Sequence, residues 1–369
     1  MDGMTSPIRR RGLMQQQQTI NSGPEKPTPE QQAPQPTLSD GYVNFELELS
    51  LPEEAYDFVF PGLMVNTFGV LVSPGGTGKS MWLLQAAVSI AAGIDAWGLF
   101  GGVHPTAGPV ILVSAEDPKI VLVNRMRVLQ RARPDLFTKG MFQNLHIKPV
   151  IGKNWRLGTW SQTEYARSAE AEILKADINL LKPRLLGLDT FNRCLGGINE
   201  NDNAAIGRVV CDLEALIDGS PTAGLILHHT NKFAAQNDQG STQQAARGAS
   251  AITDNARYQA NLMTMTEKQF ADFDIEDDER RFWVEMTVTK ANHIAPVEPI
   301  WLHREEGGLL VAVEDGPQKA LSPKNGNGKG KGGLPVGKGN GGSGGRTGRT
   351  PDTRGDELDA RITREQGDW

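Results

Sequence analysis

The chain has 369 residues, with 38 Lys or Arg against 44 Asp or Glu, so its formal net charge is −6. This balance gives no overall sign of nucleic-acid affinity, so any DNA-binding surface would have to be a local channel or tail. The sequence has no apolar run as long as a membrane span, and its early Arg9-Arg10-Arg11 run precedes no signal-peptide core. Cys194 and Cys211 lack metal-ligand spacing, and because they provide no disulfide framework they indicate a reducing compartment. We therefore expect a cytoplasmic protein with no membrane partner.

Residues 1–40 are rich in Gln, Pro, Thr and Ser, a composition that buries too little apolar surface to offset chain entropy. We expect this arm to be disordered, and its role stays open between a partner-binding tether and an inert extension. A folded domain is expected over residues 41–315. Its aromatic residues 56–63 either flank an adenine or pack at an edge, and edge packing is favoured because aromatic residues are most often core residues.

An apolar strand over residues 68–72 leads into a glycine loop and then a helix over 81–87. The loop reads Ser73, Pro74, Gly75, Gly76, Thr77, Gly78, Lys79, Ser80, Met81. Small residues let backbone N–H groups approach phosphates, as in the P-loop of ATP-binding proteins, where Lys79 would reach the β/γ-phosphates and Ser80 would bind Mg²⁺. Ser73 stands where the pattern has glycine, a mild departure. The alternative, a glycine-rich turn, is disfavoured by the order of strand, loop and helix.

A second apolar strand, over residues 109–115, ends at Glu116-Asp117-Pro118. In open α/β sheets the carboxyl ends of the strands face the ligand crevice, which would place Glu116 to polarise a water against a γ-phosphate. The alternative is a helix cap, because Asp117-Pro118 suits the start of a helix through residues 120–131. Both roles are compatible, because Asp117 could cap the helix while Glu116 polarises the water.

A third strand, over residues 185–188, stops at Asp189-Thr190, with Asn192 and Arg193 on a loop facing the same crevice. This is the Walker B arrangement, in which the aspartate holds Mg²⁺ through water or through Ser80. An apolar run ending in Asp is weak evidence alone, and its weight comes from the order of the signals.

Two helices are predicted around this strand. Ser161 and Glu164 have the spacing of a capping box ahead of a helix through residues 171–174. A helix from about Ala204 has one apolar face and closes at Gly219, which makes it a crossover helix.

A fourth strand, over residues 224–227, delivers His228-His229-Thr230 at its tip. Adjacent strand residues point to opposite sides, so two neighbouring histidines are poor partners for one zinc ion. His229 is the better candidate to hydrogen-bond a γ-phosphate and report its loss to the next loop. The alternative is a histidine satisfied by a neighbouring carbonyl.

The segment from residue 231 to 248 is long and polar, and loops of this length are usually functional or disordered. Its Lys232, Gln243 and Gln244 suit contacts to a single DNA strand. Arg247 has the position of an arginine finger acting on a neighbouring subunit's nucleotide, and the alternative is an ordinary surface arginine.

Alternating patterns over residues 281–288, 299–302 and 308–311 predict antiparallel strands that extend the sheet. Lys290 follows the first of these, where it either contacts DNA phosphate or is a solvated turn lysine. The remaining residues, 316–369, are rich in Gly and Lys over most of their length and are expected to form a disordered tail. The tail either binds DNA loosely or is a solubilising linker.

The order of these motifs resembles that of the RepA family of plasmid-encoded hexameric replicative helicases, which have a RecA-like P-loop (AAA ATPase) core. The likeness covers about residues 57–313. It rests on residues 72–81, Ala115-Glu116-Asp117-Pro118, Leu188-Asp189-Thr190, Leu227-His228-His229, Ala246-Arg247-Gly248 and Lys290-Ala291-Asn292.

The resemblance implies an α/β fold whose mostly parallel sheet is flanked by helices and extended by an antiparallel β-meander. It also implies a homohexamer that hydrolyses ATP with Mg²⁺ at subunit interfaces and moves 5′ to 3′ on single-stranded DNA. In that family pattern Lys79 and Ser80 bind the Mg²⁺ triphosphate, Glu116 activates water and Asp189 supports Mg²⁺. His229 is the γ-phosphate sensor, Arg247 the finger and residues 231–247 the channel loop.

Three rival interpretations stay open. A RecA-like ATPase in recombination or regulation would use the same ATP residues without unwinding DNA. A DNA-binding replication accessory would use ATP only to switch assembly, and Glu116 argues against it because a pure switch needs no such carboxylate. A small-molecule P-loop kinase is disfavoured by the lack of an acceptor-binding lid segment. A primase or an initiator protein is the expected protein partner of a replicative helicase.

Overall fold

The computed structural model describes residues 41–161, 164–229 and 251–320, and the chain divides into two units between Tyr56 and Asp57. The first unit contains one short helix, α1 (Phe45–Glu48), capped by the side chain of Asn44. All of its described residues are exposed. This unit therefore adds nothing to the hydrophobic core.

The second unit is built on a sheet of nine strands in the order β13-β12-β11-β10-β3-β9-β8-β4-β5. The strands are β3 (Phe68–Ser73), β4 (Val110–Ser114), β5 (Leu145–Pro149), β8 (Leu185–Asp189), β9 (Ala223–His229), β10 (Tyr258–Thr264), β11 (Trp283–Ala291), β12 (Ile300–Arg304) and β13 (Leu310–Ala312). Neighbours from β10 to β5 pair in parallel, whereas β11, β12 and β13 continue the sheet in antiparallel pairing. The predicted fold class is confirmed.

Two short hairpins lie outside this sheet. One joins β1 (Phe58–Phe60) to β2 (Leu63–Met64), and the other joins β6 (Gly158–Ser161) to β7 (Glu164–Arg167). The second hairpin shows that the predicted capping box at Ser161 and Glu164 is wrong. The next helix instead begins after Ser168, whose side chain accepts a hydrogen bond from the backbone N–H of Ala171.

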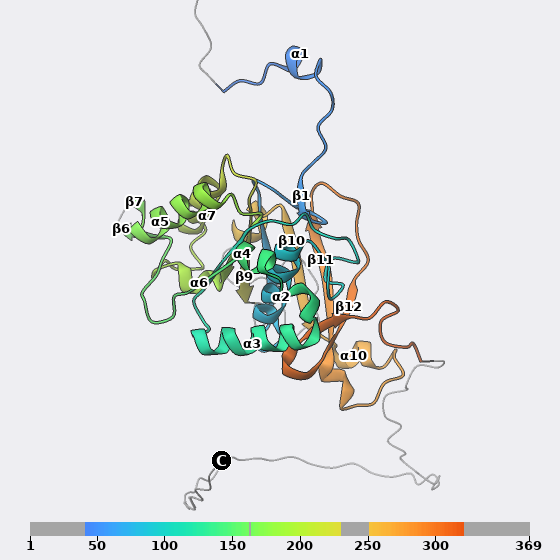
Figure 1. Ribbon diagram of the computed structural model, residues 1–369. Helices are drawn as coiled ribbons and strands as arrows, with labels where there is room; N and C mark the ends of the chain where they lie inside the picture. The colour runs from blue at the N-terminus through green and yellow to red at the C-terminus, as the bar shows by residue number, and fades with distance from the viewer. Residues whose placement is uncertain (1–40, 162–163, 230–250, 321–369) are drawn as a thin grey trace, which may run out of the picture. The chain divides into compact units, whose positions relative to one another are not determined.

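Helices cover both faces of the sheet (Figure 1). The α-helices are α2 (Lys79–Ala92), α3 (Lys119–Ala132), α4 (Lys139–Asn144), α5 (Ala169–Leu181), α6 (Phe191–Cys194), α7 (Asn203–Ile217), α9 (Ala251–Asn255) and α10 (Glu267–Phe270). Short 3-10 turns are η1 (Pro134–Leu136), η3 (Glu279–Phe282) and η4 (Glu306–Gly308). The expected crossover helix is therefore found as α7.

Alternate residues of the central strands enter two separate cores, because successive side chains of a strand point to opposite faces. Leu71 of β3 packs in the core that contains the buried side of α2. Its neighbours Val70 and Val72 pack in the core that contains the apolar faces of α5 and α7. In Figure 1, α5 and α7 accordingly lie together, apart from α2, α3 and α4. The P-loop helix is thus held between the sheet and the α3–α4 layer.

The aromatic segment ahead of the P-loop packs inside the protein. Phe60 stacks on Phe100 with ring centroids 4.7 Å apart, and it meets Trp82 and Tyr258 edge to face. Trp82 and Tyr258 are almost completely buried. Edge packing, the favoured interpretation of residues 56–63, is confirmed for Phe60.

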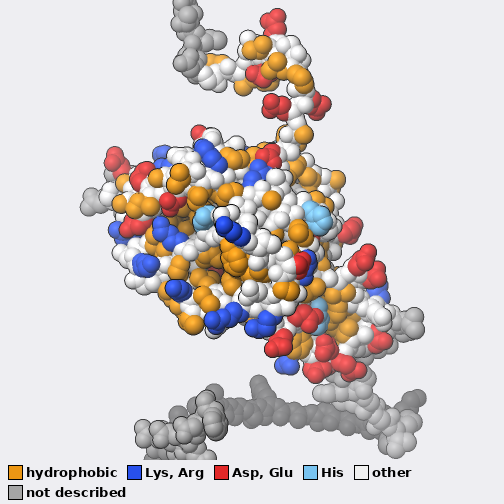
Figure 2. Space-filling model, in the orientation of Figure 1, with side chains coloured by type: hydrophobic (Ala, Val, Ile, Leu, Met, Phe, Trp, Pro, Cys, Tyr) orange, Lys and Arg blue, Asp and Glu red, His pale blue; other side chains and the backbone are white. Residues whose placement is uncertain are grey.

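Charge is segregated on the surface although the net charge is small. Helix α3 carries Lys119, Arg125, Arg127 and Arg131 and contains no acidic residue. Acidic side chains gather in the region of α10, where residues 272–279 supply Asp272, Asp274, Glu276, Asp277, Asp278 and Glu279 (Figure 2). Among the described residues, no helix has the length and apolar character needed to span a membrane.

Candidate functional site

The loop between β3 and α2 has the open geometry of a phosphate cradle. Gly76 and Gly78 have φ angles of 81° and 108°, which favour glycine because side chains with a Cβ rarely adopt them. A Cβ added at Gly75 or Gly76 would meet no atom within 4 Å. The loop therefore leaves free space in front of its backbone at the N-terminus of α2, where N–H groups favour anions.

A pocket of about 440 Å³ opens over this loop. It brings together residues from three predicted motifs: the P-loop with Lys79 and Ser80, Glu116 after β4, and His229 at the end of β9. The complete lining is Gly75, Gly76, Gly78, Lys79, Ser80, Met81, Glu116, Asp117, Arg125, His229, Arg304, Gly307 and Gly308. The carboxyl ends of parallel strands thus meet at one edge of the sheet, as the sequence order predicts.

Lys79 lies at the centre of the site with an exposed fraction of 6%. Its Nζ lies 3.3 Å from Nδ1 of His229, within range for a hydrogen bond to the neutral ring. Burial lowers the pKa of Lys79, while the nearby carboxylates of Glu116 and Asp189 oppose that shift. A buried ammonium held by a histidine is well placed to take a stronger anionic partner.

Glu116 is held in its ionised form. His229 contributes most, with Nε2 3.8 Å from Oε1 of Glu116, and the Thr190 hydroxyl donates to the same oxygen at 3.0 Å. Together with the charge of Lys79, these groups lower the pKa of Glu116 to about 2, against the opposing effect of burial. Arg193 also approaches, with Nε 3.9 Å from Oε1. A carboxylate ionised at neutral pH can accept a proton from a water in the pocket.

Asp189 has the opposite electrostatics. Burial raises its pKa to about 6, and the charges of Glu116 and Asp117 add to this effect, whereas Ser80 and Lys79 oppose it. Its Oδ1 is buried and has no hydrogen-bond partner among the described residues. The Ser114 hydroxyl, at the paired position on β4, is likewise buried without a partner in that part of the chain.

The unsatisfied oxygens of Asp189 and Ser114 indicate whether the site suits Mg²⁺. Hard divalent cations prefer oxygen ligands, and Asp189 and Ser80 supply a carboxylate and a hydroxyl beside the loop. An orphaned carboxylate oxygen is costly unless it is paired with a cation. The residues present therefore fit a magnesium site in which Ser80 and Asp189 are the protein groups.

Two predictions about neighbouring residues need correction. Asp117 does not cap α3, because the N-cap residue is Pro118 and makes no side-chain cap; Asp117 instead forms an ion pair with Arg125. Lys290 lies within β11 rather than in a connection, and its Nζ donates to the carbonyls of Thr253 and Asp254 at 2.9 Å each. This lysine closes the end of α9, and its contact with DNA stays a prediction.

The other predicted DNA and finger residues, Lys232, Gln243, Gln244 and Arg247, lie outside the described residues. In contrast, the pocket contains a residue that the motifs did not reveal. Arg304 comes from the end of β12 and donates from Nη2 to the carbonyls of Gly76 and Thr77, at 3.2 and 2.6 Å. An arginine at the end of a strand carries no sequence signal for a loop more than two hundred residues away, so pattern reasoning had no means to find it.

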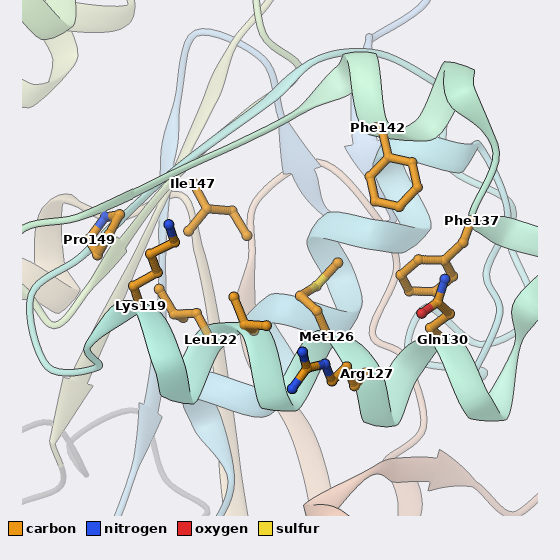
Figure 3. Close-up of a pocket in the computed structure, with 10 residues that line it drawn as sticks. Lys119, Leu122, Met126, Arg127, Gln130, Phe137, Phe142, Ile147 and Pro149 are labelled. Atoms are coloured by element: carbon orange, nitrogen blue, oxygen red, sulfur yellow. The ribbon is translucent and has the colours of Figure 1, made fainter.

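A second pocket, of about 410 Å³, is an apolar groove between α3, α4 and β5. In Figure 3, Leu122 and Met126 of α3 point toward the space bordered by Phe137, Phe142 and Ile147. Lys119 and Arg127 are the charged residues among its lining, and none of the lining residues is shared with the first pocket. The groove lacks the open backbone and the carboxylates of the first pocket, so phosphate chemistry is assigned to the P-loop.

Comparisons with solved structures and with family models both match this chain. A solved structure of an ATPase domain is similar to this chain, with 15% sequence identity, a TM-score of 0.49, and an alignment that covers 75% of this chain and all of that one. A family model described as "AAA domain" matches residues 32–235, a segment that includes the P-loop, Glu116, Asp189 and His229. Because this match spans more than half of the sequence, the chain belongs to the AAA-domain family.

Proposed function

We propose that this protein is an ATP-dependent replicative DNA helicase that hydrolyses Mg²⁺-bound ATP at the P-loop pocket. The observation that carries the proposal is the chain of contacts from Lys79 through His229 to Glu116. It joins a phosphate-binding lysine, a residue that can sense phosphate and an ionised carboxylate in one pocket, the set that nucleotide hydrolysis needs.

Each residue of the pocket has a distinct task in this proposal. The backbone of residues 73–81 and the ammonium of Lys79 bind the triphosphate, and Lys79 exchanges His229 for phosphate oxygens. Glu116 orients the attacking water and accepts its proton. Ser80 and Asp189 would hold Mg²⁺, which neutralises charge on the phosphate oxygens when bound. His229, released from Lys79, donates a hydrogen bond to the γ-phosphate after the ring nitrogen that accepted from Lys79 takes up a proton.

The helicase part of the proposal rests on the order of motifs shared with the RepA family. Residue 229 ends β9 and is followed along the chain by residues 231–247. A change at His229 would therefore pass directly into the segment that we assign to single-stranded DNA, with Lys232, Gln243 and Gln244 as contacts. Arg247 would reach the nucleotide of the next subunit in a homohexameric ring. Replication of a plasmid or similar element, with 5′ to 3′ movement, follows from the same resemblance, as does a primase or an initiator as partner.

The first test is ATP hydrolysis with and without single-stranded DNA, for the wild type and for Lys79→Ala. We expect DNA to stimulate the wild type, and we expect Lys79→Ala to be inactive because its phosphate contact is lost. Lys148→Ala is the matched control, since Lys148 is a surface lysine whose ion pair with Asp177 is half exposed.

Forked DNA with a single 5′ or 3′ tail, and sedimentation of the ATP-bound protein, complete the test. Unwinding from the 5′ tail by a hexamer supports the full proposal. Hydrolysis that DNA does not change would contradict the helicase role and favour a regulatory ATPase or an ATP-driven switch.

A further inference from the structure

The strands β12 and β13 contact the P-loop and its helix at three points. Arg304 donates to the carbonyls of Gly76 and Thr77. Leu310 lies against Gly78, where an added Cβ would come within 3.3 Å of Leu310 Cδ1. Gln85 of α2 exchanges two hydrogen bonds with the backbone of Leu310, at 2.6 and 2.9 Å, and both residues are fully buried. The antiparallel end of the sheet therefore supports the outer side of the phosphate loop.

Arg304 differs from the other two contacts because it is a cation in the pocket itself. It is half-buried, and burial lowers the pKa of its guanidinium. Within residues 41–161, 164–229 and 251–320, no carboxylate pairs with it, so the charge is compensated there by two backbone carbonyls alone. A half-buried cation without a counter-ion is costly to desolvate and favours an anion beside it.

The direction of these hydrogen bonds gives the residue its role. A P-loop binds phosphate through backbone N–H groups, which requires each peptide plane to be turned so that its carbonyl faces away from the ligand. The guanidinium of Arg304 holds two of these carbonyls, those of Gly76 and Thr77. The peptide groups of residues 76 and 77 are thereby fixed before any ligand arrives.

We infer that Arg304 is a positioning residue that pre-orders the P-loop for a nucleoside triphosphate in the same subunit. This inference rests on the proposed function and deepens it, since it assigns a nucleotide-affinity role to the antiparallel strands. Arg304 acts through the loop and takes no part in proton transfer. Its contribution is equal in the ground state and the transition state, so its loss raises KM for ATP and leaves kcat unchanged.

The test compares Arg304→Gln and Arg304→Lys with the wild-type protein. We expect Arg304→Gln to raise both KM for ATP and the Kd of a fluorescent ATP analogue at least about tenfold, the ratio expected for losing a charge-assisted hydrogen bond. We expect kcat to stay within about twofold of the wild type, as for lost uniform binding. The KM and Kd of Arg304→Lys should lie between those of the wild type and Arg304→Gln, because a lysine keeps the charge but lacks the planar fork of donors.

The matched control is Arg280→Gln. Arg280 also donates to a backbone carbonyl, that of Met265 at 2.9 Å, but it comes from η3 and does not line the pocket. We expect this variant to keep the wild-type KM. If a substitution unfolded part of the protein instead of disordering the P-loop, a smaller fraction of the molecules would be active. The apparent kcat would then fall while KM stayed unchanged.

The outcomes separate the inference from the function. If the wild type hydrolyses ATP but Arg304→Gln keeps KM and Kd within twofold, or loses kcat at unchanged KM, the inference is wrong and the proposed function stands. If the wild type neither binds nor hydrolyses ATP, the proposed function fails and the inference fails with it. If Arg304→Gln does not fold by circular dichroism, Arg304→Lys decides, and an unchanged KM in that variant contradicts the inference.

Discussion

Two regions of the sheet differ in whether particular buried polar groups have hydrogen-bond partners. Where the parallel strands end, the buried Asp189 Oδ1 and Ser114 Oγ have no partner among the described residues, and the loop leaves open space over Gly75 and Gly76. Where the antiparallel strands meet the P-loop helix, the amide of Gln85 and the backbone of Leu310 satisfy each other completely. The two oxygens at the parallel strand ends are unsatisfied and the Gln85–Leu310 pair is satisfied, although both sets are buried.

This difference in hydrogen-bond satisfaction distinguishes polar groups that bind a ligand from polar groups that stabilise the fold. An unsatisfied buried oxygen lowers stability unless a ligand completes it, whereas a satisfied pair contributes stability at all times. Substitutions at the parallel end should therefore change activity more than stability, or even raise stability. Substitutions at the antiparallel support should do the reverse.

The largest expected effect comes from Glu116→Gln. Removing the ionised carboxylate should lower kcat at least about a hundredfold, the size typical of losing a general base, with KM for ATP nearly unchanged. Steady-state ATP hydrolysis measures both constants. Glu267→Gln is the control, because its side chain is 90% exposed and far from the motif residues in the sequence. A kcat within a few-fold of the wild type would show that Glu116 is not the base.

Gln85→Met should have the largest effect on stability. It leaves the buried N–H and C=O of Leu310 without partners, and each unsatisfied group costs about 1–3 kcal/mol. We expect the free energy of unfolding in urea to fall by roughly 2–4 kcal/mol, on the basis of those two groups. Gln143→Met, on the exposed side of α4, is the matched control. A loss below about 0.5 kcal/mol, the range of ordinary surface changes, would contradict the assigned support role.

Asp189→Asn should have a smaller effect, and of the opposite sign. The pKa of Asp189 is raised to about 6 from its ordinary value of 3.8, so ionising this carboxyl opposes folding at neutral pH. Asparagine removes that penalty, and without Mg²⁺ or nucleotide we expect the variant to be more stable at pH 7.5 by roughly 1–3 kcal/mol, from the size of the shift. Thermal unfolding at several pH values measures the difference.

The gain in stability of Asp189→Asn depends on pH. The penalty is fully present above about pH 6 and is lost as pH falls through the folded pKa toward 3.8, so wild type and Asp189→Asn should converge near pH 4. ATP hydrolysis by the variant should nevertheless be impaired, because its magnesium ligand is weakened. A variant less stable than the wild type at pH 7.5 would contradict the view that this carboxylate is held at a cost.

The motif residues were predictable because they follow a local rule. Glu116, Asp189 and His229 each stand at or just past the end of an apolar run, and Lys79 follows such a run after a glycine loop; parallel strands bring such ends to one edge. Their individual electrostatics were not predictable. Glu116 and Asp189 look alike in the sequence, yet contacts with His229 and Thr190 lower one pKa while burial raises the other.

The unpredicted parts depend on pairing that no local pattern encodes. Strand β10 lies beside β3 at the centre of the sheet, but its buried Gln259 and Asn261 interrupt the apolar pattern. The Gln259 side chain donates from Nε2 to Oδ1 of Asn261 at 3.0 Å, which lowers the cost of burying the two amides. Arg304 was missed for a related reason, since its partners are backbone carbonyls and these carry no residue identity.

The two hydrogen bonds between Gln85 and the backbone of Leu310 show that the folded unit extends at least to β13. The family model stops matching at residue 235, although the second unit of the chain continues beyond that residue. The helix that follows the P-loop is completed by the backbone of a three-residue strand near residue 310. The matched segment is therefore shorter than the part of the chain that supports the P-loop helix. Recombination between relatives that joined a foreign C-terminal sequence after residue 235 would transfer the motifs but not their support.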